Sequence, residues 1–436
     1  MGELYYQVKL SKVYDDSFLI SPYYTWLIIS FIEKVKNSFM RNISLKINFR
    51  DILFGSAFFL YIFEQLIISS YYSTIFPSWF FELILFIAIG ICLLKIILFD
   101  LQFTKRRLVF YFIVFAIILL TFLTSKRQAL ILQIIFILSS YKIDLKRVLL
   151  YDLIAQIFCD IVIILSASFG IVENAYYPGR GYGLGFMYYS YLGLSLYAIT
   201  CIYIILRSLN GKSASYFEII LLLLANYTVY ITCGSKTPYY LAVAFLIGYI
   251  IICKLHIITF YSKIWKTIAT IIIPIIYGGI SILIWMYAKG FFDMYLLSEW
   301  RTMILRIRYT FNGIVEYGIH LLGQEYSMEQ GYYLDCGYVF VLIVYGVLFT
   351  IGLTLLYIFL FRYLYSTKNQ VLYLWMLICL VGCISTNFLL NVIHNPLLFL
   401  IPNIISKRKT TIFKKNLGNK NQIIKHYLHN NFGRLQ

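Results

Sequence analysis

Five basic residues stand in segments suited to binding an anion. Arg180 lies in the glycine-rich stretch YPGRGYGLGF at 177–186, which leads into an apolar segment; exposed amides at such a turn favour an anion. Lys236 lies in a second tight turn, CGSKTP at 233–238. Because arginine offers a bidentate fork to phosphate, the set predicts a phosphate or diphosphate site. The other three members share one long connection: Arg301, Arg306 and Arg308.

A reaction at such a site would need a base, and the same long connection offers three candidates. His320, Glu325 and Asp335 could each take a proton from a substrate hydroxyl, and each could equally be a solvated loop residue. A diphosphate leaving group must be neutralised as its bond breaks. Metal-dependent glycosyl transfer usually uses an Asp-x-Asp pair for this, and none stands in the segments predicted to face outward. The arginines therefore favour a mechanism without metal or cofactor.

The elements that must hold these residues are membrane-spanning helices. Hydrophobic residues make up 61% of the chain and charged residues only 13%, against about a quarter in a soluble domain. Apolar stretches of about 16 to 24 residues recur, the length that crosses a bilayer as a helix. The sequence lacks the alternation typical of an outer-membrane barrel. Its eight cysteines show no metal-ligand or redox spacing. An all-α polytopic membrane protein is predicted.

About twelve spans are predicted, and basic residues orient them. Most of the 37 Lys and Arg residues fall in alternate connections and in both terminal segments, which places both termini in the cytoplasm. The basic balance is thus an orientation signal and not a sign of nucleic-acid binding. Lys126, Arg127 and Lys289 break the pattern at helix ends, where ion pairs or contacts with lipid phosphate are expected. The fourth and the last spans are short and could be half-helices or re-entrant segments. The spans are 51–70, 79–99, 108–123, 129–141, 148–169, 184–206, 216–232, 239–255, 267–287, 336–361, 371–385 and 395–405.

One polytopic domain at 49–405 is flanked by two basic segments. The arm at 1–48 is expected to be cytoplasmic or interfacial, since its apolar run is short and contains Pro22. The tail at 406–436 is expected to lie near anionic lipid headgroups. Within the domain, 289–335 forms one large outer loop, and amphipathic spacing around 312–325 predicts a short surface helix there.

Several short motifs resemble the Wzy family, the polymerases of O-antigen and capsular polysaccharide repeat units. The similarity covers roughly 46–405, and the order and spacing of the motifs carry it. Two positions depart from the family, since Lys236 stands where relatives carry Arg and Ser190 where they carry Asn. The matching stretches are 180–186 with the pattern R-x3-LGF, 234–237, 306–324, Leu334-Asp335-x2-Tyr338 with Tyr345-Gly346, and 391–396.

The resemblance implies a metal-independent glycosyltransferase of GT-C-like fold in the inner or plasma membrane of a bacterium. It would join undecaprenyl-diphosphate-linked repeat units on the outer leaflet, for O-antigen, capsule or exopolysaccharide. A chain-length regulator and a flippase are implied partners. The catalytic residues would be Arg180 and Arg306 on the donor diphosphate with Asp335 or His320 at the acceptor hydroxyl, and the substrate-binding residues Lys236, Arg301, Arg308, Gln324, Tyr338 and Tyr182.

Two other functions fit parts of the pattern. An O-antigen or other surface-glycan ligase would share the membrane architecture and the lipid-diphosphate donor. A flippase or other transporter of the same lipid would need ionisable residues near the bilayer midplane and internal symmetry. Glu64, Lys95, Asp152 and Asp160 are the candidates, but no symmetry relates them and transport leaves the long loop unexplained.

Overall fold

The computed structural model describes residues 48–100, 105–258, 260, 262–292, 301–327 and 334–405, and these are mostly helical. Residues 1–47 of the predicted arm and the whole predicted tail at 406–436 lie outside the described residues. In chain order the α-helices are α3 (Phe49–Ile68), α4 (Ser78–Phe99), α5 (Lys105–Ser125), α6 (Gln128–Ser139), α7 (Leu145–Ser168), α8 (Tyr191–Leu209), α9 (Tyr216–Cys233), α10 (Lys236–Tyr249), α11 (Lys263–Ala288), α12 (Arg301–Tyr317), α13 (Gly337–Phe340), α14 (Gly346–Thr367), α15 (Gln370–Gly382) and α16 (Ile401–Ile405).

Eight helical segments in the described residues are long and apolar enough to cross a membrane, which supports a multi-pass, all-α membrane protein. Four further apolar helices are shorter: the Phe115–Ser125 part of α5, α6, α15 and the segment Pro396–Ile405. Helices thus stand at all twelve predicted positions; eight of them meet the length and hydropathy of a crossing within the described residues, and α5 as a whole has 21 residues. The eight are α3, α4, α7, α8, α9, α10 with its π-helical extension η2 (Ile250–Lys254), α11, and α13 continued through η5 (Val341–Tyr345) into α14.

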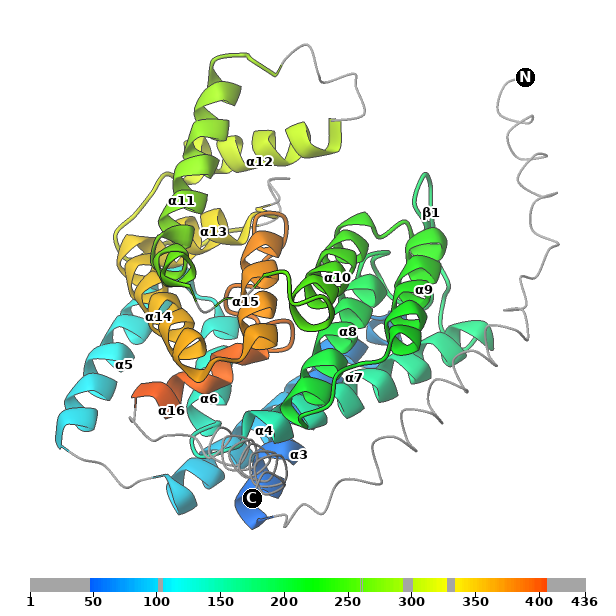
Figure 1. Ribbon diagram of the computed structural model, residues 1–436, viewed down its shortest axis with the longest axis horizontal. Coiled ribbons are helices and arrows are strands. Elements are labelled where there is room, and N and C mark those ends of the chain that lie inside the picture. Colours follow the sequence, from blue (N-terminus) through cyan, green and yellow to red (C-terminus); the bar gives the residue numbers. More distant parts are fainter. Residues whose placement is uncertain are drawn as a thin grey trace, which may run out of the picture.

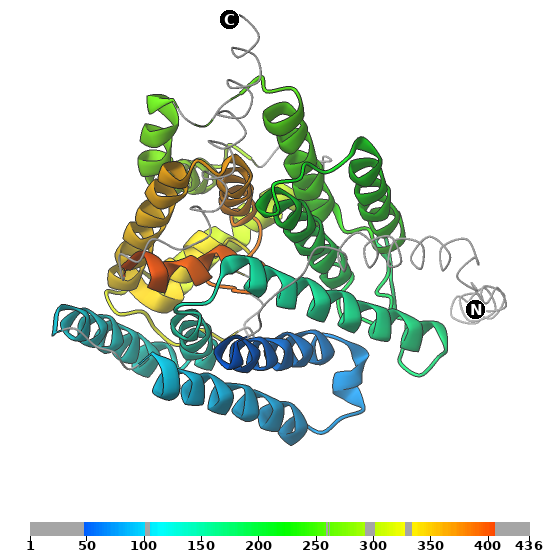
Figure 2. The same ribbon diagram turned by 60° about the horizontal axis from the view of Figure 1, so that its bottom comes forward.

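The helices pack side by side around a core of large apolar side chains. Figure 2 shows α3 between α4 and α7, and α7 in turn packs on α8. Phe58, Tyr197 and Trp375 are almost completely buried in this core. Phe86 on α4 and Ile264 on α11 are each 69% exposed, as expected of helix faces turned toward lipid.

A tight turn joins α9 to α10. A capping box begins α9, in which Ser215 and Glu218 satisfy each other's backbone N–H groups. The helix ends at Gly234, whose left-handed φ of +63° closes it. Because α10 begins two residues later, Lys236 is the first residue of that helix.

The span predicted at 184–206 begins late. The structure has a short antiparallel hairpin, β1 (Tyr176–Tyr177) and β2 (Gly181–Tyr182), followed by an irregular turn. Residue Phe186 of that turn bridges to Ser70 next to η1 (Tyr71–Thr74). The apolar residues at 184–190 therefore belong to the turn, and α8 begins at Tyr191.

The surface helix predicted around 312–325 lies earlier, as α12. Its inner side buries Ile304 and Ile307, whereas Arg308 is exposed, so the helix is amphipathic as expected. Figure 1 shows α12 near the top of the molecule beside α11, with β1 at the upper right. We call this the α12 end; it also carries the first residues of α10 and α13.

Candidate functional site

Arg180 occupies the turn of the β1–β2 hairpin, and glycines hold this hairpin against the α9–α10 turn. A Cβ atom on Gly181 would lie 2.1 Å from the carbonyl oxygen of Thr232, and one on Gly234 would lie 2.4 Å from the carbonyl oxygen of Arg180. Only glycine allows the two backbones to come this close. The contact brings the Arg180 segment and the Lys236 segment together, as the shared-site prediction requires.

The guanidinium of Arg180 lies over the ring of Tyr189. Its Cζ atom is 5.1 Å from the ring centroid, which is a cation–π contact. The Tyr189 ring lies beside those of Tyr177 and Tyr188, at centroid distances of 5.9 and 4.6 Å. Arg180 has no ion pair among the residues that the structure describes. The aromatic rings thus orient this guanidinium without neutralising it.

Arg306 and Asp335 connect α12 to the segment that begins α13. The Nε atom of Arg306 lies 3.7 Å from the Oδ2 atom of Asp335, and the side chains are 34% and 47% exposed. Partial burial raises the pKa of the Asp335 carboxyl, and the Arg306 guanidinium opposes this shift. An ion pair this open contributes little to stability, so a stronger anion can replace the carboxylate at Arg306.

Tyr188 relates the two arginine segments to each other. Desolvation, the neighbouring Tyr189 and the Asp335 carboxylate together raise the pKa of Tyr188 to about 12, against the opposing effect of the Arg180 guanidinium. An effect from both charged groups places the phenol near each of them. Tyr188 therefore links the Arg180 segment electrostatically to Asp335, the ion-pair partner of Arg306 on α12.

The supporting cations are less well placed. Lys236 at the start of α10 and Arg308 on α12 are both exposed, and neither has an ion pair within the described ranges. Arg301 is the first residue of α12, but its side chain lies outside the described part of the structure. Lys236 and Arg308 add unneutralised positive charge at the α12 end, which favours anions there.

His320 and Gln324 lie past the other end of α12. The Gln324 amide donates to the carbonyl oxygens of Tyr317 at 2.8 Å and Gly318 at 3.3 Å, so it folds its own loop. The exposed His320 ring lies 3.1 Å from the carbonyl oxygen of Tyr317. Between Arg306 and this loop the helix rises about 17 Å. The structure therefore does not bring either residue to the Arg306–Asp335 pair.

The two predicted tyrosines differ in exposure. Tyr338 is fully buried; its hydroxyl donates to the carbonyl oxygen of Leu380 at 2.9 Å and its ring lies 5.2 Å from that of Tyr277. The structure thus turns the Tyr338 side chain into the core at α13 and does not place it on an exposed surface. Tyr182 on β2 is 40% exposed and lies beside Tyr176, so it remains a candidate contact.

Lys126 and Arg127 hold the 318–326 loop in place. Lys126 forms the expected surface ion pair, with its Nζ atom 2.7 Å from Glu325, and both side chains are mostly exposed. Arg127 donates to the backbone carbonyl oxygen of Tyr326 at 2.5 Å, and its guanidinium lies over the ring of that tyrosine. Glu325, one of the three predicted bases, is thus the partner of a lysine.

Sequence reasoning missed Tyr188 and Tyr189. Tyrosine is so abundant in this chain, at 41 residues, that composition gave no reason to single out these two. Their signal was position, because they follow the R-x3-LGF motif directly. A hairpin that folds back on the motif brings Tyr189 beneath Arg180.

The arrangement offers cations for an anionic group and one carboxylate that could accept a proton. Among the described residues, no group of three or more His, Cys, Asp or Glu side chains is placed to hold a metal ion. Comparison with known proteins adds nothing further: no family model, no curated protein and no solved structure matches the chain.

Proposed function

We propose that the protein is a glycosyltransferase that polymerises oligosaccharide repeat units carried on a polyprenyl diphosphate. The observation that carries the proposal is a pair of guanidinium groups from distant segments at the α12 end: Arg180 lies over Tyr189 without an ion pair among the described residues, and Arg306 lies beside Asp335. Two guanidinium groups suit a diphosphate, because each can donate two parallel hydrogen bonds to phosphate oxygens. The eight or more membrane helices suit substrates with long polyprenyl tails.

In the proposed reaction, the hydroxyl oxygen of one lipid-linked repeat attacks the anomeric carbon of the growing chain. The bond from that carbon to the diphosphate oxygen breaks, and Arg180 and Arg306 stabilise the charge that develops on the leaving group. Asp335 takes the proton of the attacking hydroxyl. The same arginine that binds the leaving group thus lies beside the base, and no metal takes part.

The proposal includes a placement in the membrane. The α12 end faces outward, both termini lie in the cytoplasm and the chain crosses about twelve times, as the pattern of basic residues predicts. The membrane is the inner or plasma membrane of a bacterium. Lipid-linked repeats then reach the site from the outer leaflet after a flippase, and a chain-length regulator acts on the same product.

The test is the size profile of lipid-linked glycans in a strain that lacks the gene. Restoration with the wild type and with Lys126→Ala, a matched cation at the same end, should return long chains. Arg180→Ala and Arg306→Ala, at equal protein levels, should leave single repeat units on the outer leaflet. Complete polymer stranded on its lipid would indicate a ligase instead, and an unchanged profile in the deletion strain would rule out a glycan function.

One observation favours the transporter alternative. Asp152, Gln156 and Asp160 form a polar stripe on α7, and Ser195 of α8 joins it inside the helix bundle. Buried ionisable residues of this kind often mark transport pathways. Repeat units trapped on the cytoplasmic side of the deletion strain would support this function over polymerisation.

A further inference from the structure

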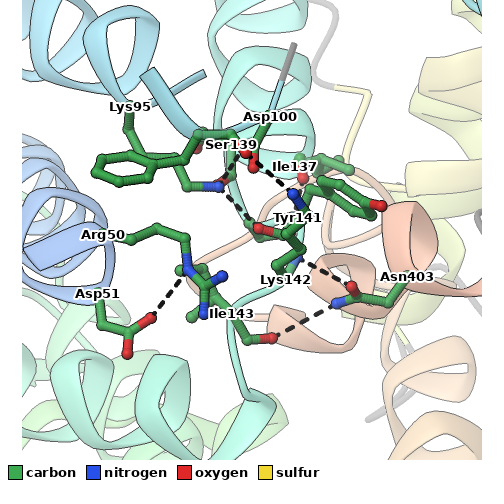
Figure 3. A network of polar contacts seen from close by, with 12 residues as sticks. Arg50, Asp51, Lys95, Asp100, Ile137, Ser139, Tyr141, Lys142, Ile143 and Asn403 are labelled. Carbon is green, nitrogen blue, oxygen red and sulfur yellow. Dashed lines mark hydrogen bonds and ion pairs between the residues drawn. The ribbon is translucent and has the colours of Figure 1, made fainter. Parts of the chain in front are cut away.

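At the end opposite α12, five helix ends meet around a network of charged side chains. Here α3 and α7 begin, at Phe49 and Leu145, and α4, α6 and α16 end. Figure 3 shows the network, with Lys95, Asp100, Arg50 and Asp51 facing the segment that joins α6 to α7. We call this the α3–α7 junction.

All three N–H donors of the Lys95 ammonium group are hydrogen-bonded within the protein. Its completely buried ammonium group donates to Asp100, to the carbonyl oxygen of Ser139 at 2.5 Å and to that of Tyr141 at 2.8 Å. These carbonyls stand at and just beyond the end of α6, where a cation is favoured. Lys95 therefore closes the end of α6, and this role leaves no donor for another group.

Arg50 and Lys142 retain hydrogen-bond donors that could bind a further group. Among the residues that the structure describes, the guanidinium of Arg50 forms one ion pair, with Asp51 at 3.5 Å from Nε, and Nε is buried with no hydrogen-bond partner. Asp51 is already paired with Arg147. The ammonium of Lys142 donates to the carbonyl oxygen of Phe99 at 3.0 Å and has no ion pair in the described ranges.

The junction carries surplus positive charge. Four cations, on Arg50, Lys95, Lys142 and Arg147, face two carboxylates, on Asp51 and Asp100, so two positive charges remain within the described residues. Asp144 and Lys146 beside them add one charge of each sign. The helix dipoles add no surplus, because the positive ends of α3 and α7 meet the negative ends of α4, α6 and α16 here.

Lipid can reach this charge. The Arg50 side chain is 25% exposed, and its neighbours Phe49 and Ile52 are 61% and 49% exposed on an apolar helix face. Phe49 packs against Phe99 of α4, and Leu98 beside it is 54% exposed. A guanidinium framed by exposed apolar side chains at a helix end lies where a bilayer places its phosphates.

We propose that the α3–α7 junction binds the phosphate of one anionic phospholipid between Arg50 and Lys142. The guanidinium and the ammonium bind the phosphodiester oxygens, and the acyl chains lie along the exposed faces of α3 and α4. The site lies at the opposite end from the proposed polymerisation site and does not depend on it.

The experiment is native mass spectrometry of the full-length protein, released from nanodiscs of equal phosphatidylglycerol and phosphatidylcholine. The wild type should retain phosphatidylglycerol over phosphatidylcholine. Arg50→Gln should bind it about fivefold more weakly, as should Lys142→Gln, because each cation near a headgroup contributes that factor. Arg50→Lys, which keeps the charge, should lose less. The matched control is Lys212→Gln, an exposed lysine in the 210–215 connection, and it should match the wild type.

Three outcomes would overturn the proposal: equal retention of the two lipids by the wild type, an equal loss in Lys212→Gln, or wild-type retention in both Arg50→Gln and Lys142→Gln. Displacement of the lipid by millimolar inorganic phosphate would show that the site takes the free anion, which also contradicts a lipid site. Circular dichroism tests whether each variant is folded. If Arg50→Gln is not folded, the lipid binding of Arg50→Lys and Lys142→Gln tests the proposal.

Discussion

The Nε atom of Arg306 lies 3.7 Å from the Oδ2 atom of Asp335, and neither side chain is buried. This pair joins the helix inside the long connection to the segment that opens α13, so it closes the α12 end on one side. The Asp335 carboxylate forms an ion pair with the Arg306 guanidinium, which is the group that would bind the proposed diphosphate. Binding of substrate would therefore exchange one anion for another and leave Asp335 free to act as a base.

Replacement of Asp335 should separate these two roles. Asp335→Asn keeps the shape but cannot accept a proton, so we expect kcat to fall about 100-fold or more. KM should change little or fall, because Arg306 loses its internal competitor. Both constants can be measured with purified protein and lipid-linked repeats. A normal kcat in Asp335→Asn would exclude this carboxylate as the base and leave only a structural pair.

The pH dependence should reflect the surroundings of Asp335. A base must be ionised to act, so activity rises as pH rises through its pKa. Burial raises that pKa, so the acid limb of kcat/KM should lie above the pH expected for an ordinary aspartate. Asp335→Glu should keep an acid limb, and Asp335→Asn should abolish it in the residual activity. An identical acid limb in Asp335→Asn would assign it to another group.

The glycines of the hairpin contact should tolerate no side chain. Gly181→Ala would place a Cβ atom 2.1 Å from the Thr232 carbonyl oxygen, and the hairpin would have to move. We expect a loss of about 1–3 kcal/mol in stability, together with loss of activity because Arg180 is displaced. Gly179→Ala is the matched control, since its φ is also positive, +73°, but nothing lies within 4 Å. The melting temperature in detergent should fall further for Gly181→Ala than for Gly179→Ala.

Hydropathy and charge predicted the helices well, because they indicate whether a segment is surrounded by lipid or by water. Apolar length located helices at all twelve predicted positions, and the turn glycines correctly marked the Arg180 segment as irregular. Apolar length also marked the fourth and last predicted spans as short, and the structure has short helices there: α6 and the segment Pro396–Ile405. The 12 residues of α6 are as apolar as those of a span, but Arg127 and Ser140 bound it closely.

The candidate site was predicted only in part, because a linear pattern gives no direction to a side chain. Tyr338 and Asp335 stand three residues apart at the start of α13, yet one is fully buried and the other is exposed. Arg306 and His320 share one loop, but a helix holds them apart. Tyr189 became part of the site through the fold of the hairpin, which composition could not show.

The two cations that hold the 318–326 loop should differ in their contribution. Lys126→Ala removes an ion pair whose side chains are 69% and 61% exposed, so stability should change by less than about 1 kcal/mol. Arg127→Ala removes a hydrogen bond to the Tyr326 carbonyl oxygen and a ring contact, so about 1.5–3 kcal/mol should be lost. Thermal unfolding in one detergent measures both. Equal effects would show that the loop is held by its other contacts.

The polar stripe between α7 and α8 contains three polar contacts. If the carboxyl groups of Asp152 and Asp160 are both ionised, only two hydrogen atoms are available to form hydrogen bonds in these contacts. The Gln156 amide lies 2.6 Å from Asp152, Ser195 lies 3.1 Å from the Gln156 oxygen, and Ser195 lies 2.6 Å from Asp160. The amide supplies one hydrogen to this chain and the hydroxyl supplies one. If all three contacts are hydrogen bonds, the third hydrogen belongs to a carboxyl group. If Ser195 donates its hydrogen to Gln156, this carboxyl group is Asp160, which donates to the Ser195 oxygen.

A neutral amide should therefore replace Asp160 well. In Asp160→Asn the new N–H group donates to Ser195, so we expect the stability to stay within about 1 kcal/mol of the wild type. Ser195→Ala breaks the chain at its centre and leaves buried polar groups without partners, which should cost about 1–3 kcal/mol. Urea or thermal unfolding in detergent compares the two. If Asp160→Asn proves as unstable as Ser195→Ala, the carboxyl is ionised and the hydrogen count given above is wrong.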